Sequence, residues 1–229
     1  DVEENAYYSE AINRVADLGI ISGFSDGTYK PNEYVTREQF AKALVVASGL
    51  EGTANSLKGI KIFPDVDPDS WSCGYINVAL HAGYISAKDD GNFHPSENIT
   101  FAEACTSLIR TLGYLDKDLP GIWPNNYISK AEALGLIKNF NLTADDPLPR
   151  WALAYMLDAL MDPNIKDKNV TFAQEHGIFT ECIVLANSKT MDTLTSAQVL
   201  TDKGTYYIKD SVKNIELGNK YGFVIEKDT

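Results

Sequence analysis

The chain has 229 residues, of which 44% are hydrophobic and 23% charged, and its formal net charge is -12 at pH 7. This length and apolar content allow one large domain or two small ones, each with a hydrophobic core. The negative charge argues against nucleic acid or an anionic membrane surface as the main partner, because both attract basic patches. No run of about 18 apolar residues indicates a membrane span. The chain begins at Asp1 without a methionine, so we expect a processed or trimmed product, and a secretory signal is one segment that could have been lost with the missing start.

An internal repeat is the strongest pattern. A shift of 64 aligns residues 1–50 with residues 65–114 without a gap, and fourteen of the fifty pairs are identical. Ordinary residue frequencies give roughly three by chance. A third copy, offset by 52 from the second, aligns Trp71 with Trp123 and Gly83 with Gly135 before its loop shortens. We name residues 1–50 copy 1, residues 63–114 copy 2 and residues 117–162 copy 3.

Each copy predicts a helix, a loop and a second helix. In copy 1, Tyr8, Ile12 and Val15 lie on one helical stripe, and Gly19 stands where a helix would end. The loop that follows carries an Asp-Gly turn signal. A single helical hairpin cannot bury its own apolar stripe, but three can bury theirs against one another. We therefore predict a mainly α fold with a pseudo-threefold helical cluster.

The second helix of each copy begins with a recognisable cap. In copy 1, Thr36 as N-cap and Gln39 three residues later fit a capping box, and Thr100 begins the same pattern in copy 2. In copy 3 Pro149 takes the place of the threonine, which the first turn of a helix tolerates. Cys105 aligns with Ala41 on the inward face of this helix, so we predict a buried free thiol.

After residue 162 the composition changes. Valine, isoleucine, threonine and aromatic residues concentrate in residues 170–179, 181–187, 197–209 and 214–227. We predict a small antiparallel β unit over residues 165–229. At about 65 residues it is near the lower limit for independent stability, so it either docks on the helices or continues into a longer parent chain.

The copies resemble the S-layer homology domain. In residues 1–41 the resemblance rests on Asp-Val, Gly-Ile-Ile-Ser-Gly, Ser-Asp-Gly-Thr-Tyr-Lys-Pro and Val-Thr-Arg-Glu-Gln-Phe-Ala. Residues 63–113 repeat these motifs, and residues 120–160 form the third copy that such proteins usually carry. The resemblance implies a spindle of three copies that binds a secondary cell wall polymer non-covalently, often through a pyruvylated sugar, in grooves between neighbouring copies.

The family's ligand-contacting segment is Thr-Arg-Ala-Glu at the start of the second helix, joined by loop glycines. Carried over to this chain, it implies a glycan site formed by Thr36, Arg37 and the loop residues Ser22 and Gly23, with Gln39 in place of the motif's final glutamate. Copy 2 has Phe101 in place of the arginine but keeps Glu103, whereas copy 3 keeps Arg150 without the threonine and the glutamate. We therefore expect the site at Thr36 and Arg37 to dominate, with Arg150 contributing less.

Physical reasoning gives the same residues two interpretations. A helix N-terminus has unpaired N–H groups that receive anions, and an arginine beside it suits a carboxylate. Alternatively, Thr36 is only a cap and Arg37 a solvated surface charge. Trp71 and Trp123 either stack on a sugar face or pack the core of the first helix, and Tyr7 holds the matching position in copy 1.

Other chemistries fit less well. A calcium-loop interpretation of the Asp-Gly loops fails because Phe24 and Lys88 stand where oxygen ligands are needed. The three histidines are dispersed, and no nucleophile–base pattern is recognisable. We therefore expect no enzymatic activity, no metal and no cofactor.

The sequence thus predicts an extracellular cell-wall anchoring module. Its expected partner is a pyruvylated secondary cell wall polymer or a peptidoglycan-linked glycan, with neighbouring S-layer subunits as further partners. The alternative is the anchor of a larger surface hydrolase or adhesin whose working domain follows residue 229. A tetratricopeptide-type array does not fit, because copies spaced 64 and 52 residues apart cannot form a regular 34-residue repeat.

Overall fold

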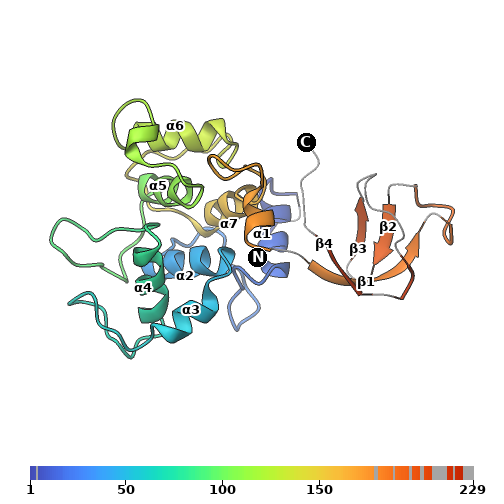
Figure 1. Ribbon diagram of the computed structural model, residues 1–229, viewed down its shortest axis with the longest axis horizontal. Helices are drawn as coiled ribbons and strands as arrows, with labels where there is room; N and C mark the ends of the chain where they lie inside the picture. Colours follow the sequence, from blue (N-terminus) through green and yellow to red (C-terminus); the bar gives the residue numbers. More distant parts are fainter. Residues whose placement is uncertain are drawn as a thin grey trace. The chain divides into compact units, whose positions relative to one another are not determined.

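The computed structural model describes residues 1–3, 5–177, 180–187, 189–195, 198–201, 204–207, 216–218 and 220–223. They fall into two compact units (Figure 1). The first is helical and holds the described residues up to 177, and the second holds the strands between residues 180 and 223. None of the described helices is long and apolar enough to cross a membrane.

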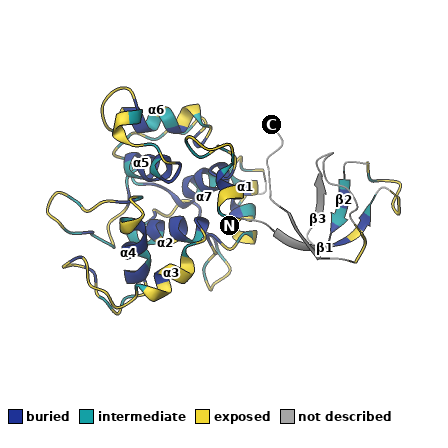
Figure 2. Ribbon diagram, viewed as in Figure 1, coloured by how far each residue is buried: buried dark blue, intermediate teal, exposed yellow. Residues whose placement is uncertain are grey.

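Three helix pairs build the helical unit. Their bounds are α1 (Ser9–Asp17) and α2 (Arg37–Ala47) in copy 1, α4 (Cys73–His81) and α5 (Phe101–Thr111) in copy 2, and α6 (Asn125–Ala133) and α7 (Arg150–Ala159) in copy 3. The short helix α3 (Glu51–Ser56) follows copy 1, and the 3-10 turn η1 (Asp116–Asp118) precedes α6. The first helix of each copy packs on the second helix of another copy, α4 on α2, α6 on α5 and α1 on α7. This cyclic packing confirms the predicted cluster, and Figure 2 shows α2, α5 and α7 largely buried within it.

A ring of three backbone hydrogen bonds marks the pseudo-threefold axis. The amide of Val35 donates to Leu148 O, that of Leu148 to Ile99 O, and that of Ile99 back to Val35 O, each at 2.9 Å. All three side chains are buried. Each residue directly precedes the cap of the second helix in its copy, so the ring brings α2, α5 and α7 together at their starts.

The N–H groups in the first turn of these helices are paired. In α2 the amide of Arg37 donates to Glu97 O at 2.8 Å, and that of Glu38 donates to Pro95 O at 3.1 Å. The same two bonds recur at α5 on the copy 3 loop and at α7 on the copy 1 loop. The predicted capping boxes of α2 and α5 are present. The expectation of unpaired N–H groups that receive an anion is therefore wrong, because the loop of the neighbouring copy takes them.

The repeated aspartate at the start of copies 1 and 2 closes the loop of its own copy. The carboxylate of Asp1 accepts from the amide of Tyr29 at 2.8 Å and from that of Lys30 at 2.6 Å. Asp65 does the same for the matching amides of copy 2, at 3.0 and 2.6 Å. Each Asp-Val motif thus fixes the loop that joins the two helices.

Cys105 lies in the core of the helical unit on α5. Its side chain is fully buried and the thiol is free, as predicted. Burial raises the pKa of Cys105 to about 12. Cys73 is also a buried free thiol.

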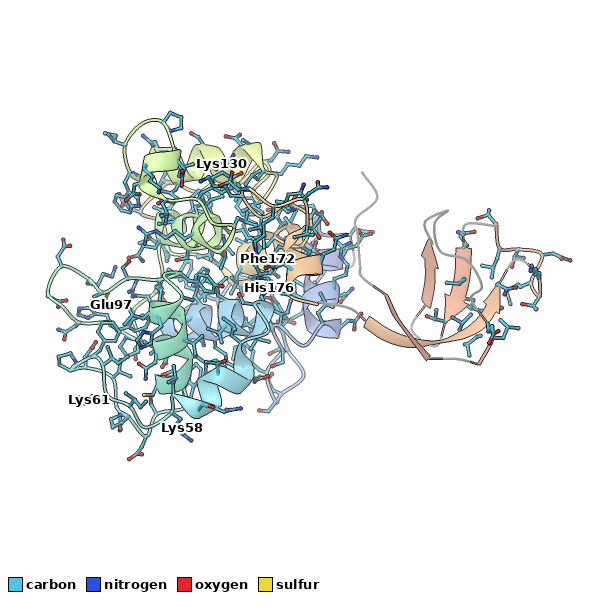
Figure 3. All side chains as sticks on the ribbon, in the orientation of Figure 1. Lys58, Lys61, Glu97, Lys130, Phe172 and His176 are labelled. Atoms are coloured by element: carbon cyan, nitrogen blue, oxygen red, sulfur yellow. The ribbon has the colours of Figure 1, made fainter. Side chains whose placement is uncertain are left out.

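The structure has the start of the β unit later in the chain than residue 165, where we expected it. Residues 170–177 hold the short helix α8 (Phe172–Glu175), which belongs to the helical unit, instead of a strand. Thr171 and Gln174 form a capping box, and the Phe172 amide donates to Pro163 O at 3.0 Å. Phe172 is fully buried, with its ring centroid 4.3 Å from that of His176 (Figure 3). The capping motif and this burial outweigh the local β-rich composition.

Four strands form the second unit: β1 (Thr180–Asn187), β2 (Gln198–Thr201), β3 (Gly204–Tyr207) and β4 (Lys220–Phe223). Their order in the sheet is β3-β2-β1-β4, and every neighbouring pair is antiparallel. A register shift between Val184 and Ala186 bends β1 away from regular pairing with β2. The prediction of a small antiparallel sheet is confirmed, while residues 208–215 and 224–229 of the predicted unit lie outside the described residues.

Candidate functional site

Two grooves lie at equivalent positions between the copies of the helical unit. The Arg37 groove has a volume of about 190 Å³ and is lined by Arg37, Ile85, Ser86, Ala87, Glu103, Thr106, Ser107, Arg110 and Trp123. The Arg150 groove has a volume of about 300 Å³ and is lined by Gly19, Ile20, Ile21, Ser22, Gly23, Phe24, Val35, Gln39, Lys42, Ala43, Trp71, Arg150 and Leu153. The 64-residue shift of the repeat relates the walls of the two grooves, since Ser22 matches Ser86 and Gln39 matches Glu103.

Each groove takes residues from all three copies. In the Arg37 groove, copy 2 forms the walls, copy 1 supplies the arginine and copy 3 supplies Trp123. In the Arg150 groove, copy 1 forms the walls, copy 3 supplies the arginine and copy 2 supplies Trp71. The reason is that each arginine stands at the start of its helix, which the loop of another copy covers.

The residues expected to form one site are consequently divided. Ser22, Gly23 and Gln39 lie with Arg150 and Trp71 in one groove, whereas Arg37 lies with Trp123 in the other. Thr36 is not among the residues that line either groove, and its hydroxyl accepts a hydrogen bond from the Gln39 amide at 3.3 Å. Its place in the structure is that of a helix cap.

Arg37 is buried and fully engaged. Only 2% of the residue is exposed. Its Nε donates to Phe93 O at 2.7 Å, its Nη2 to Ser86 O at 2.9 Å, and its Nη1 to Glu103 Oε1 at 3.1 Å. The interpretation of Arg37 as a solvated surface charge is therefore wrong, because the buried side chain connects copy 1 to copy 2 by hydrogen bonds.

Glu103 holds a negative charge at the centre of the Arg37 groove. Its Oε1 also accepts from Lys88 Nζ at 2.6 Å. Burial alone would raise the pKa of Glu103, but the hydrogen bonds from Lys88 and Thr100 and the charges of Arg37 and Lys88 lower it below its ordinary value. The carboxylate thus stays ionised at neutral pH and compensates the arginine.

Arg150 is the counterpart of Arg37 in the other groove. Its Nε donates to Tyr29 O at 2.8 Å and its Nη2 to Ser22 O at 3.2 Å, which are the matching carbonyls of the copy 1 loop. The guanidinium carbon lies 4.7 Å from the ring centroid of Phe24 and 4.6 Å from that of Tyr29. Within the part of the chain that the structure describes, Nη1 has no hydrogen-bond partner.

The two tryptophans present their rings to the solvent at the rims of the grooves. Trp71 is 50% exposed and Trp123 54% exposed, so core packing does not account for them. Trp123 Nε1 donates to Thr106 Oγ1 at 3.0 Å, which fixes the indole. Lys42 Nζ lies 5.8 Å from the Trp71 ring centroid.

The third interface between copies is filled by aromatic side chains. Phe101, which replaces the arginine, is buried with its ring centroid 6.1 Å from that of Phe140. Phe140 in turn lies 4.9 Å from Trp151 and 5.3 Å from Tyr155, measured between ring centroids. The exposed Tyr7 packs on Trp151 at 5.6 Å. We call these five residues the aromatic cluster.

Sequence reasoning missed several groove residues. Glu103 could have been found, because the repeat aligns it with Gln39, which was expected in the site. Ser107 aligns with Ala43, which was not expected there. Arg110 gave no such signal, since Val46 stands at its place in copy 1. Its Nη1 donates to Ser86 Oγ at 3.1 Å. Among the described residues, no cluster of three or more histidine, cysteine or acidic side chains could hold a metal ion.

Comparison with known proteins shows which family and which proteins the chain is similar to. Residues 1–41 and 62–105 match the S-layer homology domain family. The chain is 32% identical over 154 residues to a middle cell wall protein of Brevibacillus brevis and 34% identical over 168 residues to a cell surface protein of Thermoanaerobacter kivui. It is also 31% identical over 119 residues to an endoglucanase of a Bacillus species. These alignments cover 67%, 72% and 52% of this chain but only 14%, 22% and 12% of the respective relatives.

Proposed function

We propose that this chain, an S-layer homology domain protein related to bacterial surface-layer and cell-surface proteins, attaches a surface protein non-covalently to the cell wall by binding a secondary wall polymer. The observation that carries the proposal is the pair of equivalent grooves. Each one combines a buried arginine with a half-exposed tryptophan.

The chemistry of the grooves suits a glycan. An indole ring offers a large, rigid and partly apolar face on which a sugar ring can lie. Nη1 of Arg150, which has no hydrogen-bond partner among the described residues, can donate to a carboxylate such as that of a pyruvate ketal. Ser22 and Ser86 add polar groups at the walls. The ligand we propose is therefore a pyruvylated wall polymer or another glycan linked to peptidoglycan, and the proposed location is the outside of the cell, at the wall.

A sedimentation experiment tests this function. The purified chain is mixed with intact wall sacculi and with sacculi whose polymer has been removed by acid. We expect it to sediment with the intact sacculi and to stay in solution with the stripped ones. Replacing Trp71 and Trp123 together by alanine should reduce sedimentation, whereas Tyr34→Ala is the matched control, because Tyr34 is 53% exposed but lines neither groove. Equal sedimentation with both kinds of sacculi would contradict the proposal.

We also propose that the chain itself does not hydrolyse the glycan. Glycoside hydrolysis ordinarily uses a pair of carboxylates, whereas Glu103 is the one carboxylate among the residues that line the Arg37 groove and none lines the Arg150 groove. Incubation with the sacculi should therefore release no soluble sugar. Release that persists after repeated purification would refute this part of the proposal.

A second candidate is the anchor of a larger surface hydrolase or adhesin. The similarity to an endoglucanase favours it, since the aligned region is 12% of that relative. Both candidates share the wall-binding step, and they differ in what is anchored. Sequencing the parent gene beyond the codon for Thr229 separates them, because a catalytic domain there supports the hydrolase and further surface-layer domains support an S-layer subunit.

A further inference from the structure

The two grooves share an arginine but differ in what faces it. In the Arg37 groove, Glu103 Oε1 accepts from Nη1 of the arginine at 3.1 Å. The matching residue in the Arg150 groove is Gln39. Arg37 therefore faces the carboxylate of Glu103, whereas Arg150 has the uncharged Gln39 at the matching position.

The helix cap does not require this difference between glutamate and glutamine. Gln39 Oε1 accepts from the Thr36 amide at 3.0 Å, and Glu103 Oε2 accepts from the Thr100 amide at 3.1 Å. The capping box needs only one neutral acceptor oxygen, which both side chains supply. The second oxygen of Glu103, Oε1, is not needed for the cap and accepts from Arg37 and Lys88 in the groove.

The residue that pairs with Glu103 also differs between the two copies. Lys88, which pairs with Glu103 Oε1 at 2.6 Å, matches Phe24 in copy 1. The Phe24 ring stacks on the Arg150 guanidinium instead. An ion pair in one groove is therefore replaced by two uncharged residues in the other, while the arginine is kept in both.

We infer that the Arg150 groove binds the carboxylate-bearing sugar of the wall glycan, whereas the Arg37 groove binds an uncharged stretch of it. This assignment rests on the proposed function. It reverses the expectation that the Arg37 site dominates binding. A ligand carboxylate in the Arg150 groove meets Nη1 of the arginine and the ammonium of Lys42, which forms no ion pair among the described residues.

The same carboxylate is disfavoured in the Arg37 groove. There it would approach Glu103, and like charges placed together at an interface repel each other. Arg110 adds a positive charge at this groove, but its guanidinium already donates to Ser86 Oγ. Sugar hydroxyls are better partners here, because they can donate to the Glu103 carboxylate while the ring lies on Trp123.

Calorimetric titration of the full chain with two sugars tests the assignment. The probes are a disaccharide that carries a pyruvate ketal and the same disaccharide after acid removal of the ketal. We expect Gln39→Glu to weaken binding of the acidic sugar by about tenfold or more and to leave the neutral sugar unaffected. Glu103→Gln should open a second site for the acidic sugar, so the titrated stoichiometry should rise. Both variants keep an acceptor for the helix cap.

The matched control is Gln174→Glu. Gln174 fills the same position of the capping box at α8, with its Oε1 accepting from the Thr171 amide at 2.9 Å, and lines neither groove. Binding of the acidic sugar that is equal in the parent and in Gln39→Glu overturns the charge assignment, as does its loss in Glu103→Gln. If the parent binds neither the sugars nor intact sacculi, the proposed function fails as well. Sedimentation with intact sacculi together with unaffected variants overturns the charge assignment alone.

Discussion

Arg37→Ala should destabilise the helical unit before it reveals anything about ligand binding. The substitution removes three hydrogen bonds from a charged donor and leaves Phe93 O and Ser86 O without that partner. Breaking a buried ion pair by removing one member costs about 3–5 kcal/mol. Glu103 keeps Lys88 and its side chain is 21% exposed, so we expect the lower end, about 3 kcal/mol.

Contact with an aromatic ring adds to this value. The guanidinium carbon of Arg37 lies 4.8 Å from the Phe93 ring centroid, and such a contact contributes about 0.5–2 kcal/mol. For a domain of this size, each kcal/mol lowers the melting temperature by roughly 2–4 °C. The expected decrease is therefore roughly 7–20 °C. Arg37→Lys should be intermediate, because an ammonium cannot reach all three acceptors.

Thermal unfolding followed by far-UV circular dichroism measures the effect. The matched control is Arg110→Ala, which removes an arginine from the same groove but only an exposed hydrogen bond and a contact with the Tyr127 ring at 5.7 Å, so its effect should stay within about 1 kcal/mol. If the melting temperature of Arg37→Ala lies within about 2 °C of that of the parent, the guanidinium does not stabilise the contact between copies 1 and 2. Loss of sacculus binding by Arg37→Ala is evidence for the ligand site only at temperatures where the variant is folded.

Three further predictions follow from single contacts. The folded state lowers the pKa of Glu103 below its ordinary value of 4.5, so the contribution of Glu103 to stability is present above that pH and is lost as the pH falls through the folded pKa. In chemical unfolding at a series of acidic pH values, the free energy of unfolding of Glu103→Gln should therefore fall less steeply with decreasing pH than that of the parent. An equal slope in the two proteins would contradict this. Burial raises the pKa of Cys105 to about 12, so a thiol reagent at pH 8 should label it only when the protein unfolds, and rapid native labelling located by mass spectrometry would disprove the burial. Trp71→Ala and Trp123→Ala should each weaken binding of a wall-polymer fragment roughly two- to tenfold, from an aromatic contact of about 0.5–1.5 kcal/mol, whereas Tyr7→Ala at the aromatic cluster should bind like the parent; an equal loss in all three variants would mean that the third interface also binds.

Local sequence signals were sufficient for the helix pair of each copy and for the caps of α2 and α5. The alignment of Thr36 with Thr100 identified two helix starts, and the structure has a capping box at each. The alignment of Cys105 with Ala41 placed the thiol in the core, where it lies. The helix caps and the position of Cys105 depend on residues within one copy, so they could be predicted from the sequence of that copy.

The composition of the site depends on contacts between copies, which spacing does not reveal. Thr36, Arg37 and Ser22 lie within one copy in the sequence, but Arg37 reaches Ser86 of copy 2, and Ser22 receives Arg150 of copy 3. The error at α8 has another cause. Thr171 and Gln174 carry the cap signal, but the surrounding β-branched and aromatic residues favoured a strand, and burial of Phe172 in the helical core decided the outcome.

The origin of each groove in three copies restricts how these sites can change. A substitution in copy 1 affects the walls of the Arg150 groove through Gln39 and the Arg37 groove through its arginine. A single excised copy would contain no complete groove, and exchanging one copy for a homologous one would alter more than one interface at once. Each groove is therefore a property of the junction between copies, and a repeat forms one only where its neighbours complete it.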